Sequence, residues 1–204
     1  MIEAAGRSRL LELRRDLAAA RAGRALLDRK REAILRALTE RLPRRDALRR
    51  AAASGLADAR TALDEAQMQG GRLSVDAAAL AQPRIITIEA RETTIVGVPL
   101  PEIAAAIGPF RPRYGPASGS DRLDRAGAAF AGALPGILAL AAEEAAVGRL
   151  RAALTRTVRR LNALDTLVLP ELVRETHRVA AALEEEERDE AVRRKLWLAA
   201  AGGS

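Results

Sequence analysis

The stretch that decides the fold is TVRRLNALDTLVLP, residues Thr157 to Pro170. Apolar residues in and around it recur three or four positions apart, which predicts one apolar face of a helix: Leu154, Val158, Leu161, Leu164, Val168 and Leu172. Beside that face stand four polar residues, Arg159, Arg160, Asn162 and Asp165. A polar side chain at a helix–helix seam costs stability unless it is paired, and its best-attested use is to fix register and partner choice. The alternative is that these four side chains lie on the solvated side of the helix.

The N-terminal third of the chain reads as one helix from about Ala4 to Gln67. Its apolar residues follow an alternating three-four repeat, which predicts a coiled-coil seam: Leu10, Leu13, Leu17, Ala20, Leu27, Ile34 and Leu38. Arg24 and Arg31 interrupt this repeat with polar side chains. Because proline lacks an N–H and clashes with the preceding turn, we expect Pro43 to kink or interrupt the helix.

The middle of the chain, residues 68–120, has a different character. Gly70-Gly71 should end the first helix, and two runs rich in Ile, Val and Thr, RIITIEA and TTIVGV, predict a β-hairpin over about residues 84–98. We place its turn near Arg91-Glu92 and its apolar side chains at Ile86, Ile88, Val96 and Val98. LPEIAAAIG should then form a short helix opened by Pro101, and residues 108–120, dense in Pro, Gly and Ser, should form a loop.

A second long helix is expected over residues 121–198, with kinks at Pro135 and Pro170 and a tail at 199–204. Each long helix carries a continuous apolar stripe, so pairing the two antiparallel would bury both stripes, and heptad-like spacing implies a left-handed twist. The predicted fold class is therefore mainly α. It is a long antiparallel two-helix left-handed coiled coil, residues 1–67 with 121–198, carrying a cap with a small β-hairpin and a short helix at 68–120.

Composition narrows the possible functions. The chain has 204 residues, a formal charge of +7, no Cys and only one Trp, one Tyr and two Phe. The charge alone suggests a basic coiled-coil module that binds nucleic acid or protein, but acidic residues interrupt any basic stripe. No apolar run approaches the roughly 20 residues of a membrane span, and the first residues do not resemble a signal peptide, so we expect a cytoplasmic protein. Phosphate-loop, metal-binding and nucleophile motifs are absent from the sequence, which predicts no catalytic residues, cofactor or metal.

RRLNALDTLVLPEL resembles the C-terminal signature of the D subunit of the rotary V-type and archaeal A-type ATPases, in which an R-R-x-N-A-L-E pattern precedes a proline. The N-terminal helix LLELRRDLAAARAGRALLDRKREAIL has the spaced leucines and the Gly23 of that family, and LDRAGAAF and LEEEERDE are also similar to it. The chain departs from the pattern at Asp165, where Glu is usual, and at Leu169, where Ile is usual. The resemblance covers both long helices.

The resemblance implies a non-catalytic central rotor shaft of a V/A-type ATPase. Such a shaft couples ATP hydrolysis or synthesis in a hexamer of catalytic and regulatory nucleotide-binding subunits to rotation of the ion-translocating membrane ring. It further implies two rotor partners, the small F subunit and a funnel-shaped subunit that links to the ring. The protein would lie at the cytoplasmic side, peripheral to the membrane, with no direct membrane insertion and no nucleic acid.

Antiparallel geometry adds two predictions about side chains. Equal rise in the two helices brings Arg159, Arg160, Asn162 and Asp165 opposite the segment from about Asp28 to Leu38. The charged residues of that segment are Asp28, Arg29, Lys30, Arg31 and Glu32. We expect an interhelical polar layer there that fixes register. The acidic run at 184–187 should lie beside the N-terminal arginines, the alternative being a solvated face. A basic tip should contact the hexamer as a bearing surface: Arg7, Arg9, Arg193, Arg194, Lys195 and Trp197. The alternative for Trp197 is packing against its own helix pair.

Overall fold

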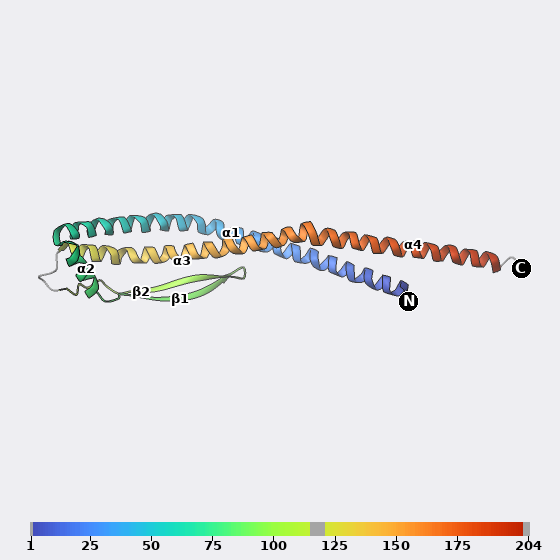
Figure 1. Cartoon of the computed structure of the whole chain (residues 1–204), viewed down its shortest axis with the longest axis horizontal. Coiled ribbons are helices and arrows are strands. Elements are labelled where there is room, and N and C mark those ends of the chain that lie inside the picture. The colour runs from blue at the N-terminus through green and yellow to red at the C-terminus, as the bar shows by residue number, and fades with distance from the viewer. Residues whose placement is uncertain (1, 115–120, 202–204) are drawn as a thin grey trace. The chain divides into compact units, whose positions relative to one another are not determined.

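The computed structural model describes residues 2–114 and 121–201. Its elements, in chain order, are α1 (Ile2–Gly70), α2 (Arg72–Ala81), β1 (Ile86–Ile95), β2 (Val98–Ile107), α3 (Asp121–Ala163), the π-helical turn η1 (Leu164–Val168) and α4 (Leu169–Ala201) (Figure 1). The fold class is confirmed: the chain is mainly helical, with two long helical segments and a small antiparallel sheet between them.

The described residues divide into two compact units. The terminal unit draws on Met1–Glu32 and Thr155–Ser204, and the hairpin unit comprises Ala33–Leu154. α1 contributes residues to both units, and so does the helix that starts at Asp121.

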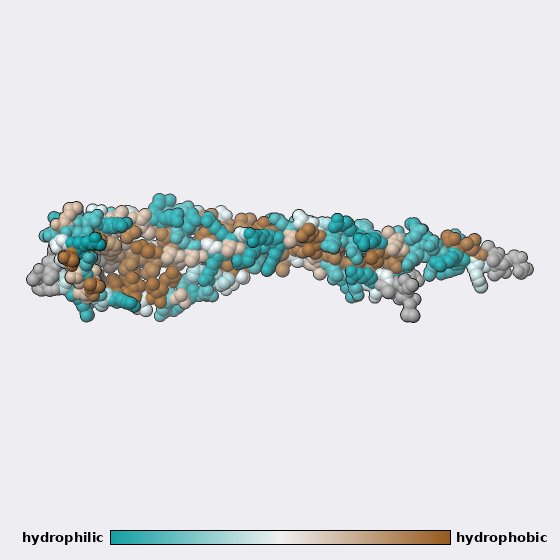
Figure 2. Space-filling model, viewed as in Figure 1, coloured by the Kyte–Doolittle hydropathy of each residue, from teal (hydrophilic) through white to brown (hydrophobic). Residues whose placement is uncertain are grey.

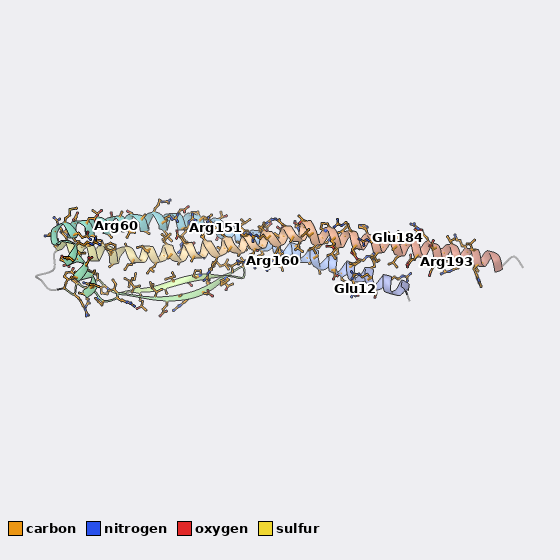
Figure 3. All side chains as sticks on the ribbon, in the orientation of Figure 1. Glu12, Arg60, Arg151, Arg160, Glu184 and Arg193 are labelled. Atoms are coloured by element: carbon orange, nitrogen blue, oxygen red, sulfur yellow. The ribbon has the colours of Figure 1, made fainter. Side chains whose placement is uncertain are left out.

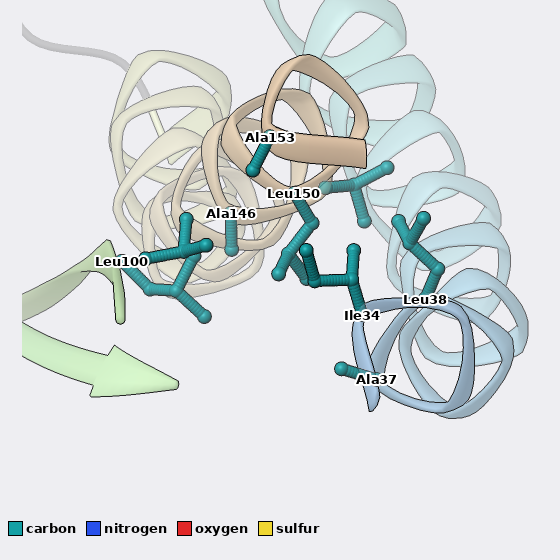
Figure 4. Packing of buried hydrophobic residues seen from close by; sticks show 9 residues of the cluster. Ile34, Ala37, Leu38, Leu100, Ala146, Leu150 and Ala153 are labelled. Carbon is teal, nitrogen blue, oxygen red and sulfur yellow. The ribbon is translucent and has the colours of Figure 1, made fainter. Parts of the chain in front are cut away.

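The core of the hairpin unit is built where three elements meet. Figure 4 shows Ile34 and Leu38 of α1, Leu100 of β2, and Ala146 and Leu150 of α3 packed together. Ile34 and Leu150 are fully buried, and the small alanines between them let the helices and the strand approach closely. A second cluster, built on Ala66, Val75, Ala78, Leu123 and Ala126, joins the end of α1 to α2 and the start of α3.

The hairpin exists, but its predicted turn near Arg91-Glu92 is wrong. β1 runs through those residues, and the turn is Val96-Gly97, with Ile95 paired to Val98. Both turn residues have positive φ, 53° at Val96 and 70° at Gly97, as the two-residue hairpin turn that matches strand twist requires. Of the four predicted hairpin side chains, Val98 is buried, Ile86 is half-buried and Ile88 is 55% exposed, while Val96 belongs to the turn.

The predicted short helix at LPEIAAAIG is also wrong, because residues 100–107 belong to β2. Two prolines explain how a strand fits here. The carbonyl oxygen of Pro99 accepts a hydrogen bond from Arg149 Nη1 at 3.1 Å, so this backbone edge faces α3 and not β1. Pro101, two residues on, shares that edge, so neither missing N–H costs a bond of the sheet. The short helix of this region is α2, which the sequence did not predict.

Prolines inside the long helices do not end them. α1 continues through Pro43 and α3 through Pro135, so the expected interruption at Pro43 does not occur. Both prolines are exposed, and water can therefore replace the backbone hydrogen bond that each proline removes. α1 ends at Gly70, as predicted, and Gly71 follows with φ 76°, a conformation that favours glycine.

One stretch corrects the expectation that no segment could cross a membrane. By length and composition alone, the continuous helix Asp121–Leu198 contains a sufficiently apolar stretch. A single such helix is weak evidence for a membrane span, because core helices of soluble proteins and signal sequences pass the same test.

Candidate functional site

The terminal unit is an antiparallel helix pair. Gly6 lies against Leu183, and Arg24, further along α1, contacts Asp165. The contacts on the second helix therefore move toward its N-terminus as α1 advances, which is the antiparallel arrangement. Glycine at position 6 permits a close approach, since a Cβ there would lie 2.9 Å from the Leu183 Cδ2 atom. The buried seam of the described residues holds Leu13 from α1 and Thr157, Leu161 and Leu183 from the partner helix.

A bidentate ion pair links the two helices. Arg24 Nε donates to Asp165 Oδ1 at 3.0 Å, and Arg24 Nη2 donates to Asp165 Oδ2 at 3.3 Å. Arg24 Nη1 lies 3.8 Å from Asp28 Oδ2, and Asp28 Oδ1 in turn lies 2.7 Å from Arg31 Nη2. The hydrogen bond to Asp165, with the nearby carboxylates, raises the pKa of the Arg24 guanidinium above its usual range. We call these four residues, Arg24, Asp28, Arg31 and Asp165, the seam charge cluster.

The predicted polar layer is only partly gathered here. Asp165 and Arg31 belong to the seam charge cluster, Lys30 is half-buried, and the other predicted members are exposed: Glu32, Arg159, Arg160 and Asn162. Figure 3 labels Arg160 on the helix. Within the described part of the chain, none of those exposed side chains makes an ion pair or hydrogen bond across to the other helix. Arg24 was not among the residues predicted for the polar layer. Its position in the apolar repeat of α1, where it replaces an apolar residue, was the signal that could have identified it.

A π-helical turn lies next to this cluster. The N–H of Leu169 bonds the carbonyl of Leu164, five residues earlier, and Pro170 has no N–H for the carbonyl of Thr166. The turn therefore contains one residue more than an α-helical turn.

This extra residue changes which side chains face α1. Before the turn, buried or half-buried positions follow the three-four repeat at Thr157, Leu161 and Leu164. An unbroken repeat would continue with Val168, Glu171 and Glu175. Instead Val168 is 39% exposed, which corrects its predicted place in the stripe. Covered positions continue one residue later at Leu169, Leu172, Thr176, Val179 and Leu183, with Glu175 half-buried beside them. The π turn thus keeps an apolar face toward α1 along α4.

The end of α4 extends beyond its partner. α1 begins at Ile2, close to Gly6, whereas α4 continues from Leu183 to Ala201 (Figure 1). Arg7 Nη2 donates to Glu187 Oε1 at 3.0 Å, which fits the predicted neighbourhood of the acidic run, and Arg9 lies 3.9 Å from Glu175. Figure 3 labels Glu184 and Arg193 along this part of α4.

The predicted tip residues are exposed at these helix ends. Arg7, Arg9, Arg193, Arg194 and Lys195 are exposed, and Trp197 is exposed by 71%. Neighbouring apolar side chains are exposed too: Val192 at 55%, Leu196 at 66% and Leu198 at 60%. A large exposed apolar group rimmed by charge is typical of a protein-interaction site.

In the hairpin unit, arginines pair with carboxylates on other elements. Arg41 of α1 donates through Nη1 to both oxygens of Glu143 of α3, each at 3.0 Å, and Glu143 is only 5% exposed. Arg149 of α3 donates through Nη1 to Glu92 of β1 at 2.8 Å, in addition to the Pro99 carbonyl. These carboxylates neutralise Arg41 and Arg149. A nucleic-acid-binding module would instead need such arginines free to contact phosphate groups.

Among the residues that the structure describes, no group of three or more His, Cys, Asp and Glu side chains could hold a metal ion. The sites described above consist of charge pairs between helices and exposed apolar side chains at helix ends.

Comparisons with known proteins give consistent findings. The family model for the D subunit of ATP synthase matches residues 9–199. The chain is 34% identical over 204 residues to the V-type ATP synthase D subunit of Anaeromyxobacter dehalogenans, covering 93% of this chain and 92% of that protein. It is 31% identical over 191 residues to the A-type ATP synthase D subunit of Methanopyrus kandleri, covering 93% and 82%. It is 31% identical over 189 residues to the V-type ATP synthase D subunit of Thermotoga neapolitana, covering 93% of each.

Proposed function

We propose a rotor function for this chain, which belongs to the family of ATP synthase D subunits. It would be the non-catalytic central shaft, coupling ATP hydrolysis or synthesis in the nucleotide-binding hexamer to rotation of the membrane ring. Membership of the family makes other ATP synthase subunits its partners and agrees with a place in a complex at the membrane periphery. Catalysis would take place in those partners.

The observation that carries the proposal is the end of α4. A single helix that extends past its partner, with Trp197 and Leu196 exposed among Arg193, Arg194 and Lys195, suits insertion into a surrounding sleeve of other subunits. Non-directional charge attraction can centre a shaft in an acidic sleeve without the deep interlocking that would impede rotation. The exposed apolar side chains would contact the sleeve at the same level.

A second exposed apolar group, in the hairpin unit, supports another partner. Met68 at the end of α1 and Leu73 and Leu80 of α2 are exposed by 82%, 86% and 88%. Leu73 and Leu80 lie seven residues apart and so share one face of α2, opposite the buried Val75 and Ala78. We assign this face to the funnel-shaped rotor subunit, and the small F subunit to the remaining surface of the paired helices.

The seam charge cluster would resist sliding of the two helices during rotation. A bidentate arginine–carboxylate pair adds geometric specificity to its charge attraction, so it favours one register over its neighbours. Exchanging the charges tests this role: Arg24→Asp and Asp165→Arg alone should each lower the number of ions moved per ATP in the reconstituted complex. The double exchange should recover most of it. Unchanged coupling in both single variants would remove the register role.

Assembly tests the function itself. When the chain carries a purification tag in its native host, we expect the nucleotide-binding subunits to co-purify in the proportions of an ATPase complex, identified by mass spectrometry. Replacing Arg193, Arg194 and Lys195 with Gln should weaken this association in a salt-dependent way and reduce ATP-driven ion transport. The matched control changes three exposed basic residues outside the long helices and α2, Arg84, Arg111 and Arg113. Purification with nucleic acid and without ATPase subunits would contradict the proposal.

A further inference from the structure

The hairpin unit contains a cavity of about 420 Å³, lined in part by residues of its second apolar cluster. It lies between the last turns of α1, α2, the segment before residue 115 and the start of α3. The larger apolar side chains of its walls include Leu63, Ile85, Phe110, Leu123, Phe130 and Leu134. Figure 2 shows apolar side chains gathered in this part of the hairpin unit, with openings between them.

The distribution of aromatic residues marks this cavity. The whole chain has one Trp, one Tyr and two Phe, and three of these four side chains line the cavity. The main core of the hairpin unit, by contrast, is built from aliphatic residues alone. Aromatic rings placed at a cavity and not in the core indicate a surface for flat apolar groups.

The walls are held in place by specific local contacts. The Phe110 ring lies directly over Gly127, where an added Cβ would meet the ring at 2.0 Å, so glycine is required for this ring to rest on α3. The Tyr114 hydroxyl donates a hydrogen bond to the Asp124 carboxylate. The Gln82 side chain, in the orientation that satisfies both groups, bonds the Arg111 carbonyl at 3.1 Å and the Arg113 N–H at 3.0 Å. The segment that carries Phe110 and Tyr114 is therefore tied at both ends.

The charge of the lining selects the ligand. The chain has 34 Lys and Arg residues, yet none of the residues that line the cavity is basic, and its one acidic residue is Asp76. An anionic ligand, such as a fatty acid or a nucleotide, would find no cation there. The lining also has three uncharged polar side chains, of which Gln82 bonds Arg111 and Arg113 and Tyr114 bonds Asp124. The amide of Gln67 is therefore the group that we assign to one polar group of the ligand.

We infer that this cavity is a binding site for a neutral, ring-containing apolar molecule with a single hydrogen-bonding group. An engineered apolar cavity of about 150 Å³ binds benzene, so the larger space here suits two or three fused rings. Ligand pockets in proteins range from about 300 to 1,000 Å³, which includes this one. The inference does not depend on the rotor function.

Fluorescence titration of the full chain with 1-aminoanthracene, a neutral three-ring amine, tests the site. We expect saturable binding of one molecule per chain. Ala131→Leu, which places a larger side chain on the cavity wall, should raise the Kd at least tenfold. Ala128→Leu, on the same helix but at an exposed position outside the lining, should leave the Kd unchanged. The anionic naphthalene probe 1-anilinonaphthalene-8-sulfonate should bind at least tenfold more weakly than 1-aminoanthracene.

A second measurement covers the case in which Ala131→Leu does not fold. Methyl NMR of the unaltered chain should show benzene-dependent shifts at Leu63, Val75 and Leu134, and none at the exposed Leu26 and Leu167 of the terminal unit. Shifts of equal size at both groups, absence of saturable binding, or equal Kd values for the Ala131→Leu and Ala128→Leu variants would each overturn the inference. Equal affinity for the anionic probe would overturn the choice of a neutral ligand.

Discussion

Deleting Val168 should leave the helix pair of the terminal unit nearly as stable as before. Val168 is exposed and belongs to the π turn that holds one extra residue. Removing one residue converts that turn to an α-helical turn and keeps Leu169, Leu172, Val179 and Leu183 on the face that α1 covers. Since a π turn accommodates its extra residue within a single turn, the axial position of α4 changes little.

Inserting one Ala after Val168 is the matched opposite change. It rotates everything after it by about 100° relative to α1, because an α-helix has 3.6 residues per turn. Leu183 is almost fully buried and Leu169, Leu172 and Val179 are half-buried. At roughly 1.5–3 kcal/mol for each full burial of such a side chain, the insertion should cost about 5 kcal/mol. This is comparable to the whole stability of many domains, about 5–15 kcal/mol.

Urea unfolding followed by far-ultraviolet circular dichroism measures both changes. The deletion should shift the unfolding midpoint by the equivalent of about 1 kcal/mol or less, and the insertion should lower it several times as much. A deletion that destabilises the protein as strongly as the insertion would refute the claim that the π turn sets the phase of the apolar face.

Three further variants test other parts of the structure. Val96→Asn should stabilise the hairpin by about 1 kcal/mol, because Asn tolerates positive φ better than a β-branched residue, and thermal unfolding would show a higher Tm; a lower Tm would contradict the turn. Arg41→Ala should cost about 3–5 kcal/mol in urea unfolding, because it leaves the buried Glu143 carboxylate without its partner, whereas a double change of both residues to Leu should recover most of this loss. Burial, together with the bond to a carboxylate, raises the pKa of Tyr114 above its usual value near 10. Because the unfolded chain ionises first, this contribution to stability is complete below about pH 10 and is lost as pH rises toward the folded pKa, so Tyr114→Phe should flatten the fall of stability above pH 10.

The long helices could be predicted from sequence because their three-four apolar repeats are long and their ends carry clear signals, such as Gly70-Gly71. The hairpin could be predicted only as an element. Its turn, Val96-Gly97, lies inside a run of β-branched residues, and only Gly97 signals the positive φ. Ala104, Ala105 and Ala106 favour helix on their own, but pairing with β1 outweighs that preference.

The candidate site was less accessible to sequence reasoning. A π turn has no strong local sequence pattern. The regular apolar spacing therefore assigned Val168 to the buried stripe, whereas in the structure Leu169 continues that stripe. The available signal was Pro170, which has no N–H to bond the carbonyl of Thr166. The polar partner of Asp165 was expected in the segment from about Asp28 to Leu38, because sequence defines the register of two helices only to within about one turn. Arg24, about one turn before Asp28, is the residue that makes the contact.

The central claim is that the end of α4 turns inside a sleeve of nucleotide-binding subunits. The chain has no Cys, so Trp197→Cys places a single thiol on the tip, where a cleavable cross-linker can join it to a neighbouring subunit of the reconstituted complex. The measurement is the ATP hydrolysis rate before cross-linking, after it, and after cleavage of the linker. We predict that hydrolysis stops on cross-linking and returns on cleavage. Cross-linked complexes that hydrolyse ATP at the original rate would contradict a rotating tip.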